Sequence, residues 1–538
     1  MIVFLDCLFY IVLEYEKRKK SSFMTFGTRK IIKNYYGLIS GLLLFFAILF
    51  LIPAESMPDP AKKMAASALL MAILWITEAI PIPVTAILPI VLFPILKIMP
   101  TDKVTPNYGH HLIFLFLGGF IIALTIERWN LHKRIALRII NFVGTNRRLI
   151  ILGFMIATAF LSMWISNTAT TMMMIPIGMA IISQINGSGD IKQNGPGKNN
   201  FAIALMLGIA YSASIGGMAT IIGTPPNVVF IGILKSNFPA APEISFMQWM
   251  LFALPFSFVF LPLVWFYLVY IAAPLNQTRE KEIKSDIILH ELKNLGPMSR
   301  TEQITLFIFI TTALLWLFRS NIDLGTFHIT GWASLLGLKG LVQDSTVAIF
   351  MAVLTFMIPA GTDQEGKQQF LMEWQWAKRV PWGILLLFGG GFALASGFQE
   401  SGLTSWLGEQ LKTFHFLPLG LIIAVVCTMA TFTTEFASNT AMASTLLPIL
   451  ASLSVALRIN PIILMVPATI SCSAAFMLPV ATPPNAIVFG SGYLQIRDMV
   501  KVGLILNLIG LVLILVVVYL LAEPVFNIDW NQFPVWAK

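Results

Sequence analysis

The chain has 538 residues, of which 57% are hydrophobic and only 11% are charged, and its mean hydropathy is +0.81. In an ordinary soluble domain about a quarter of the residues are charged, so this composition excludes a single soluble core and indicates a polytopic membrane protein. The formal net charge of +9 does not indicate a nucleic-acid partner, because the Lys and Arg residues cluster in short connections and form no basic stripe with interleaved aromatics.

The first apolar run long enough for a membrane span begins near residue 37. A helix needs roughly 20 apolar residues to cross about 30 Å of hydrocarbon. Residues 1–36 precede this run, and their basic stretch "EKRKK" follows the apolar residues at the start, whereas a signal peptide carries its charges first. We therefore expect 1–36 to be an uncleaved cytoplasmic extension, in which Met24 is a second possible start.

Apolar runs predict the first spans near 37–53, 65–81, 82–98 and 111–128. The connection that follows, from Arg128 to Arg148, holds six Arg and Lys residues, and an excess of such residues marks cytoplasmic loops. The apolar sequence at 149–184 has a polar centre, which favours a re-entrant hairpin from the cytoplasmic side over two full spans. Spans near 201–234, broken at "GTPPN", and 246–271 then lead to a charged cytoplasmic segment.

The second half continues this pattern in the opposite orientation. Three further spans, near 304–318, 344–360 and 382–399, bring the chain to the outside, where the next connection is poor in basic residues. A second hairpin near 417–456 then enters from outside, before a broken span near 461–494 and a last span near 502–522. The expected fold class is an all-α membrane protein with about eleven spans and two re-entrant hairpins, with its N-terminus inside and its C-terminus outside.

Three motif pairs are in register between the halves. "FLGGF" around Gly118 matches "FGGGF" around Gly390, and "SNT" follows at the same distance in both, at Ser166 (166 − 118 = 48) and Ser438 (438 − 390 = 48). Downstream, "GTPPN" matches "ATPPN" once a 14-residue polar insertion at 187–200 is allowed for. Halves of opposite topology form an inverted repeat, an arrangement that places the binding site near the midplane of many secondary transporters and argues against a passive channel.

The polar tips of the two hairpins combine features that suit both an anion and a small cation. Irregular backbone is tolerated at membrane depth only inside protein or beside water. Ser, Asn and Thr can cap the helix that follows, whose N-terminus favours an anion, and their oxygens together with freed carbonyls suit a cation such as sodium. The alternative is that these residues only join neighbouring helices. For Glu435, ligand contact and a structural or proton-linked role both stay open.

The paired "SNT" and "TPPN" motifs resemble the divalent anion:sodium symporter family, also called solute carrier 13 or the INDY type. Residues 472–488 also resemble that family's sodium:sulfate symporter signature, with matches at Ser473, Phe476, Pro479, Asn485 and Val488. The resemblance extends over nearly the whole chain from about residue 37.

This resemblance implies a homodimer in a bacterial inner (plasma) membrane, whose protomers each have a scaffold domain and a transport domain that moves like an elevator through the lipid bilayer. The division of the chain that we expect is the cytoplasmic extension 1–36, scaffold helices at 37–110, a first repeat at 111–245, scaffold helices and a cytoplasmic loop at 246–381, a second repeat at 382–495 and a C-terminal span at 496–538.

The resemblance also implies the residues of the site. A first sodium ion (Na+) would bind Ser162, Ser166, Asn167 and the carbonyl of Gly223. A second would bind Thr434, Ala437, Ser438, Asn439 and Ala481. The carboxylates of the substrate would meet Asn167, Thr168, Asn439 and Thr440, with Thr482 and Pro483 close by.

We therefore expect sodium-coupled symport of a di- or tricarboxylate such as succinate, malate, fumarate, 2-oxoglutarate or citrate. A sodium-independent dicarboxylate exchanger and a sodium:sulfate symporter stay open, as do the number of sodium ions per cycle and the direction in the cell. An enzyme is not expected, because the chain has no HExxH or GxSxG motif and no grouped His or Asp residues.

Overall fold

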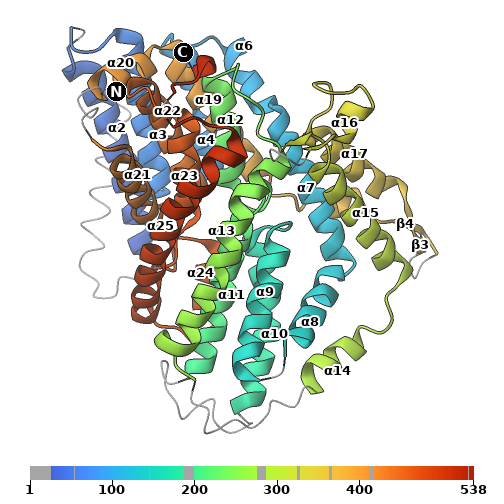
Figure 1. The fold of residues 1–538 in the computed structure, drawn as a ribbon. Coiled ribbons are helices and arrows are strands. Elements are labelled where there is room, and N and C mark those ends of the chain that lie inside the picture. Colours follow the sequence, from blue (N-terminus) through green and yellow to red (C-terminus); the bar gives the residue numbers. More distant parts are fainter. Residues whose placement is uncertain are drawn as a thin grey trace.

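The computed structural model describes residues 26–53, 55–144, 146–186, 199–275, 286–323, 328–362, 366–411, 417–530 and 532–537. Over these residues the chain is mostly helical, with two short antiparallel strand pairs (Figure 1). Six of the described helices are long and apolar enough to cross a membrane. Most of the N-terminal extension (1–25) and most of the insertion (187–198) lie outside the described residues.

The first two helices of the described part, α2 (Phe26–Leu51) and α3 (Asp59–Thr77), pack along each other. The apolar run at 82–98, predicted as one span, is instead divided into α4 (Ile82–Ala86) and α5 (Leu88–Ile95). Proline has no N–H to donate to the preceding turn, and Pro89 at the start of α5 accounts for this interruption. The short helix α6 (Thr101–Val104) and the 3₁₀ turn η1 (Thr105–Gly109) complete this region.

The elements of the first repeat follow the predicted order. They are α7 (His111–Arg128), α8 (Leu131–Val143), α9 (Arg147–Ser162), α10 (Asn167–Asn186), α11 (Asn200–Met218) and α12 (Pro225–Asn237), and they lead into α13 (Phe246–Phe266) and its π-helical extension η2 (Tyr267–Ala272). Helix α8 occupies the basic connection, where the sequence did not predict a helix. It is amphipathic, so it buries Leu137 and Ile140 while Arg138 remains exposed.

Between the repeats lie shorter elements and two long helices. They are α14 (Asp286–Asn294), α15 (Arg300–Leu317), the strands β1 (Ile322–Asp323) and β2 (His328–Ile329), α16 (Trp332–Leu335), α17 (Asp344–Met357), the strands β3 (Pro359–Thr362) and β4 (Gln368–Phe370), and α18 (Trp374–Ala377). Helix α17 packs along α7, and α15 lies beside α17 on the right of Figure 1.

The second repeat has the same order of helices as the first. It consists of α19 (Trp382–Glu400), α20 (Leu403–Leu411), α21 (Leu419–Thr434), α22 (Asn439–Ala456), α23 (Pro461–Ser473) and α24 (Pro483–Gly490), followed by α25 (Ile496–Phe526) and the 3₁₀ turn η5 (Val535–Ala537). Helix α25 packs against α13, its counterpart after the first repeat, and against α21 and α23.

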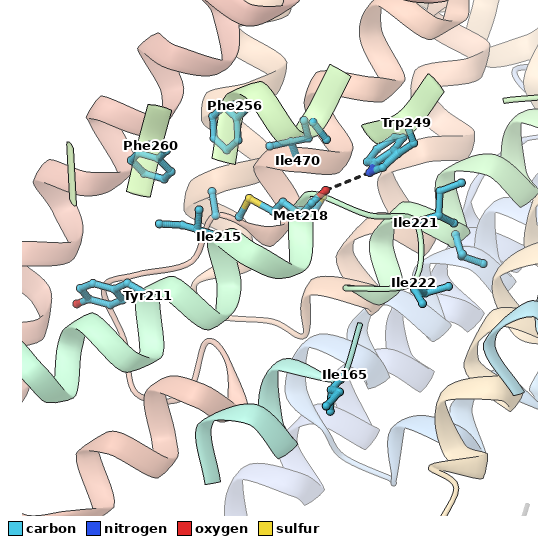
Figure 2. Packing of buried hydrophobic residues seen from close by; sticks show 14 of the residues in the cluster. Ile165, Tyr211, Ile215, Met218, Ile221, Ile222, Trp249, Phe256, Phe260 and Ile470 are labelled. Atoms are coloured by element: carbon cyan, nitrogen blue, oxygen red, sulfur yellow. Dashed lines mark hydrogen bonds between the residues drawn. The ribbon is translucent and has the colours of Figure 1, made fainter. Parts of the chain in front are cut away.

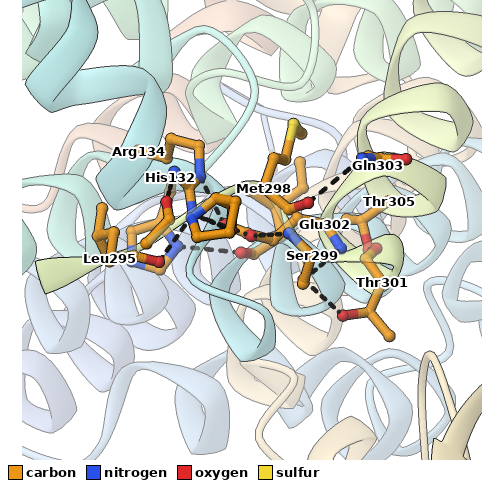
Figure 3. Close-up of polar contacts among 12 residues, drawn as sticks. His132, Arg134, Leu295, Met298, Ser299, Thr301, Glu302, Gln303 and Thr305 are labelled. Carbon is orange, nitrogen blue, oxygen red and sulfur yellow. Dashed lines mark hydrogen bonds and ion pairs between the residues drawn. The ribbon is translucent and has the colours of Figure 1, made fainter. Parts of the chain in front are cut away.

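The amphipathic helix α8 is fixed by a buried ion pair (Figure 3). Arg134 of α8 donates twice to the carboxylate of Glu302 in α15, at 2.8 and 3.1 Å, and also to the carbonyls of Leu295 and Gly296 at 3.1 and 2.9 Å. The planar guanidinium matches a carboxylate in this two-pronged geometry. Helix α8 is therefore tied to the segment that enters α15.

Candidate functional site

The first hairpin reverses direction at residues 163–166, which we call the first tip. Ser166 stands directly before α10. Its hydroxyl accepts a hydrogen bond from the N–H of Ala169 at 3.3 Å, and its carbonyl accepts one from Thr170 at 3.0 Å. This is the capping contact that the sequence predicts for "SNT". The positive end of the 20-residue helix α10 therefore lies at the first tip, where it favours an anion.

The side-chain amide of Asn167 faces three oxygen atoms. It lies 2.6 Å from Ser162 Oγ, and with its nitrogen turned toward these neighbours it also donates to the carbonyls of Ala213 (3.1 Å) and Gly223 (3.2 Å). A half-turn of the amide brings its oxygen to the same place, so that a hydroxyl, two carbonyls and an amide oxygen converge. Neutral oxygen atoms in such an arrangement are ligands that sodium accepts.

Two glycines allow this close approach. A Cβ atom on Gly217 would collide with the Asn167 amide, and a Cβ atom on Gly223 would collide with the carbonyl oxygen of Gly217. Both glycines are therefore required by the space between the first tip and the backbone behind it.

Helices α11 and α12 are separated by residues 219–224, which we call the first break. The buried side chain of Asn227 donates to the carbonyls of Thr220 (2.7 Å) and Met218 (3.3 Å). The Met218 carbonyl also accepts a hydrogen bond from Trp249 Nε1 at 3.0 Å, within the apolar packing that Figure 2 shows. The hydroxyl of Thr220 donates to the Met163 carbonyl at 2.5 Å, which joins the first break to the first tip.

The second repeat contains the same contacts in the same register. The second tip, residues 435–438, lies between Thr434 and Asn439, whose side chains are 2.8 Å apart, in the positions of Ser162 and Asn167 (434 − 162 = 439 − 167 = 272). The second break is residues 474–482. Its carbonyls at Ala475 and Leu478 each accept a hydrogen bond of 3.1 Å from the side chain of Asn485.

These acceptors correspond to Gly217, in the last turn of α11, and to Thr220, in the first break. Asn227 donates to both carbonyls, and all three offsets are equal (475 − 217 = 478 − 220 = 485 − 227 = 258). The repeat found in the motifs is therefore also a repeat of side-chain hydrogen bonds.

The hydroxyl of Thr434 has two oxygen neighbours at the same distance, Asn439 Oδ1 and the carbonyl oxygen of Cys472, both at 2.8 Å. A hydroxyl has one hydrogen to donate, so three oxygen atoms share a single proton. Like Asn167, Asn439 therefore lies among oxygen atoms.

The hairpins pack across the repeats as well as within them. Helix α10 lies against α24 of the second repeat, and α22 lies against α12 of the first. Thr440, on α22, is buried and Thr168, on α10, is half-buried. Thr482 caps α24 by accepting a hydrogen bond from the N–H of Asn485 at 3.3 Å, and Pro483 is the first residue of that helix.

The predicted sodium ligands divide into two groups. Ser162, Asn167 and Gly223 come together in the first repeat, and Thr434 and Asn439 come together in the second. Ser166 caps α10, while Ala437, Ser438 and Ala481 lie in the second tip and the second break without a described contact between them.

The sequence did not predict three groups that contact residues in or beside the two tips. The carbonyls of Ala213 and Cys472 carry no signal in the residue type, because every residue has a carbonyl. Asn507, on α25, donates to Glu435 at 2.8 Å. A polar residue in the run "LILNLIG" was a possible signal, and Asn507 stands at the register position of Trp249 (507 − 249 = 258).

Two solved structures share this fold at 12% sequence identity. The YdaH transporter of Alcanivorax borkumensis has a TM-score of 0.53 over 86% of this chain and 98% of that chain. MtrF of Neisseria gonorrhoeae has a TM-score of 0.54 over 89% of this chain and 96% of that chain. At this level of identity the similarity shows the fold alone.

Curated relatives are similar along nearly the whole chain. The sodium-dependent dicarboxylate transporter SdcS of Staphylococcus saprophyticus is 45% identical over 524 residues, which are 96% of this chain and 98% of that protein. The protein of the same name from Staphylococcus aureus strain MRSA252 is 43% identical over 530 residues, 97% of this chain and 96% of that protein. The family model described as the sodium:sulfate symporter transmembrane region matches residues 33–528. The chain therefore belongs to the sodium:sulfate symporter family, the divalent anion:sodium symporters that its paired motifs resemble.

Proposed function

We propose that the protein is a secondary active transporter that carries di- or tricarboxylates across a bacterial plasma membrane by symport with sodium. The observation that carries this proposal is the pair of oxygen clusters around Asn167 and Asn439, each beside the N-terminus of a long helix. Relatives 43–45% identical that are named sodium-dependent dicarboxylate transporters support the coupling ion and the substrate class.

The charge of the substrate must be balanced without a basic side chain. Neither tip and neither break contains Lys or Arg. The remaining sources of positive potential are the N-termini of α10 and α22 and the sodium ions themselves. An anion would therefore bind well only after sodium, which provides a physical basis for coupling.

We assign the first sodium ion to Ser162, Ser166, Asn167 and the carbonyl of Gly223. The convergence of three of these groups supports the assignment, and it adds the Ala213 carbonyl as a candidate ligand. We assign the second ion to the matching groups of the second repeat, which are Thr434, Ala437, Ser438, Asn439 and Ala481. The Cys472 carbonyl is a further candidate in that repeat.

The substrate is assigned to the side chains that follow each tip. Asn167 and Thr168 would bind one carboxylate, and Asn439 and Thr440 the other, with Thr482 and Pro483 at the start of α24 beside them. The packing of α10 on α24 and of α22 on α12 supports a single site shared by both repeats.

The same proposal includes the membrane arrangement. The two hairpins are re-entrant, about eleven spans leave the N-terminus inside and the C-terminus outside, and two protomers form a homodimer. Each protomer consists of a scaffold and a transport domain that moves as an elevator, because one site with inverted halves must reach both membrane faces.

Uptake of labelled succinate into proteoliposomes tests the function. A sodium gradient should accelerate uptake, and removal of sodium should abolish the stimulation. Counterflow from preloaded vesicles that is indifferent to sodium would instead establish the exchanger. Competition by sulfate but not by citrate or 2-oxoglutarate would establish the sulfate symporter that the family name suggests.

A further inference from the structure

The second tip contains a carboxylate that is buried inside the protein. Glu435 is only 1% exposed. Its Oε1 accepts hydrogen bonds from the N–H groups of Phe476 (2.8 Å) and Met477 (2.9 Å), and its Oε2 accepts from Met477 (3.1 Å) and Leu478 (3.0 Å). The side-chain amide of Asn507 donates the fifth hydrogen bond to this carboxylate, at 2.8 Å from Oε1. A buried charge is costly unless it is fully hydrogen-bonded, and this one is.

The donors to Glu435 are available because α23 ends early. Helix α11 continues to Met218, whose register partner is Phe476 (476 − 218 = 258), whereas α23 ends at Ser473. The N–H groups of residues 476–478 are thus released from the helix. Successive backbone N–H groups form a concave anion-binding site, and Glu435 fills it with a carboxylate from the protein itself.

The second break is also held from its other sides. Tyr211, on α11, donates its hydroxyl to the Phe476 carbonyl at 2.9 Å. Gly503, on α25, lies so close that a Cβ atom there would collide with the same carbonyl. The position of the second break therefore depends on α11, α25 and Glu435 together.

No carboxylate stands at the matching position of the first repeat. The residue in register with Glu435 is Met163 (435 − 163 = 272). There, the N–H of Ala219 donates to the Gly216 carbonyl at 3.0 Å, so part of the first break continues the hydrogen bonding of the helix. The first tip is joined to the first break by the hydrogen bond that the Thr220 hydroxyl donates to the Met163 carbonyl. Tip and break are thus joined by a hydroxyl in the first repeat and by a buried carboxylate in the second.

We propose that Glu435 is a positioning residue for the second sodium site, with Asn507 as its support on α25. Four of the five groups assigned to that ion lie in or beside the second tip, and the fifth, the Ala481 carbonyl, lies in the second break. Glu435 joins these two segments and also brings a negative charge to the tip that holds the cation. The inference rests on the proposed sodium coupling and extends it, because it makes sodium affinity depend on a residue that is not a sodium ligand.

The test compares variants of the full-length protein in proteoliposomes. Glu435→Gln keeps the size of the side chain but removes the negative charge. It also places an amide NH2 group, which is a donor, against backbone N–H groups that need an acceptor. Glu435→Asp keeps the charge on a shorter side chain, and Asn507→Ala removes one contact. The control is Glu400→Gln, because Glu400 pairs with Lys103 in an exposed ion pair. Two values are measured with labelled succinate, the sodium concentration for half-maximal uptake and the KM for succinate at saturating sodium.

The half-saturating sodium concentration should rise at least about fivefold in Glu435→Gln, and about two- to threefold in Asn507→Ala and Glu435→Asp. The KM at saturating sodium should stay within about twofold in all of them. Glu400→Gln should match the wild type. Sodium-dependent thermal stabilisation of the purified variants, without succinate, should fall in the same order.

Unchanged sodium dependence in a folded Glu435→Gln variant would overturn the positioning role, even if that variant melts at a lower temperature. If Glu435→Gln does not fold, unchanged sodium dependence in both Asn507→Ala and Glu435→Asp would overturn it. If neither uptake nor melting temperature of the wild-type protein depended on sodium, the proposed function itself would be overturned. That result is distinguishable from a failure of the positioning role alone.

Discussion

Thr434 and Asn439 lie on opposite sides of the second tip, with their side-chain oxygens 2.8 Å apart. The Cys472 carbonyl is at the same distance from the Thr434 hydroxyl, so a single proton serves three oxygen atoms. Ser162 and Asn167 make the matching contact in the first repeat at 2.6 Å. The convergence of side-chain and carbonyl oxygen atoms beside both tips is the physical reason to expect a cation at each.

Replacement of Thr434 by Val should weaken sodium binding and leave the fold intact. The substitution keeps the shape of the side chain and removes the hydroxyl, so we expect the half-saturating sodium concentration to rise about tenfold. Thr428→Val is the matched control, because Thr428 is on the same helix and its hydroxyl donates to the carbonyl of Ala424, one turn earlier in that helix. An equal response of both variants in sodium-dependent uptake would contradict a ligand role for Thr434.

Either Asn167→Ala or Asn439→Ala should abolish sodium-stimulated transport. Each asparagine is assigned to both a sodium ion and the substrate, so its loss affects two bound groups at once. Yield and melting temperature should stay near those of Asn141→Ala, a control at an exposed position on α8. Wild-type uptake kinetics in both variants would show that the site lies elsewhere.

Gly217→Ala should disturb the first sodium site through packing. Its Cβ atom would collide with the Asn167 amide, and overpacking of this kind costs about 1–3 kcal/mol. Gly420→Ala, on α21, meets no atom within 4 Å and should be neutral or stabilising by about 0.5–1 kcal/mol. Thermal melting with and without sodium separates the two effects, and an unchanged sodium response in Gly217→Ala would refute the close packing described above.

Arg134→Ala should destabilise the protein severely. It would leave the buried carboxylate of Glu302 with only the Ser299 N–H as a donor among the described residues, and it would remove a donor from the carbonyls of Leu295 and Gly296. Breaking a buried ion pair costs about 3–5 kcal/mol. Arg379→Ala is the comparison, because its pair with Glu127 is partly exposed and worth less than about 1 kcal/mol. Thermal unfolding in detergent measures both, and equal melting temperatures would count against the ion pair as an anchor of α8.

The same ion pair predicts a loss of stability in acid. Burial alone would raise the pKa of Glu302, which precedes the apolar run at 304–318, but hydrogen bonds from Arg134 and from the Ser299 N–H outweigh burial and lower it below the ordinary value of 4.5. A carboxyl with a lowered folded pKa stabilises fully above its unfolded pKa and loses that contribution as pH falls. Melting temperature should therefore decline below about pH 4.5 more steeply in the wild type than in Glu302→Gln. Parallel curves would contradict the shift.

Much of the fold could be predicted because apolar runs and breaks are local signals. The starts of α10 and α22 at Asn167 and Asn439 coincide with the "SNT" motifs, and α12 and α24 begin at the first proline of each "TPPN". Proline fixes φ and cannot donate to the preceding turn, so the residue type alone marks these boundaries. The interruption between α4 and α5 has the same cause, but the apolar run at 82–98 is continuous in hydropathy and so predicts a single span.

The helix α8 was missed for a different reason. Its basic residues suggested a loop, but a helix that buries Leu137 and Ile140 can also bury Arg134 if a carboxylate is present. Glu302 is 168 residues away, and no local pattern indicates this partner. The strands of the two pairs are only two to four residues long. Strand formation depends on the side chains that pack nearby, so such short strands leave no clear pattern in the sequence.

The sequence by itself determined the helical class, the internal repeat of motifs and the residues of the two tips, because periodicity, proline and capping residues act within a few positions of the chain. Tertiary structure decided which atoms meet there. The carbonyls of Ala213 and Cys472, and the donors to Glu435, belong to backbone that is distant in the sequence, and a backbone group gains a partner only when packing brings it close. For the same reason the sequence left the role of Glu435 open, and the early end of α23 is what supplies the N–H groups that its carboxylate binds.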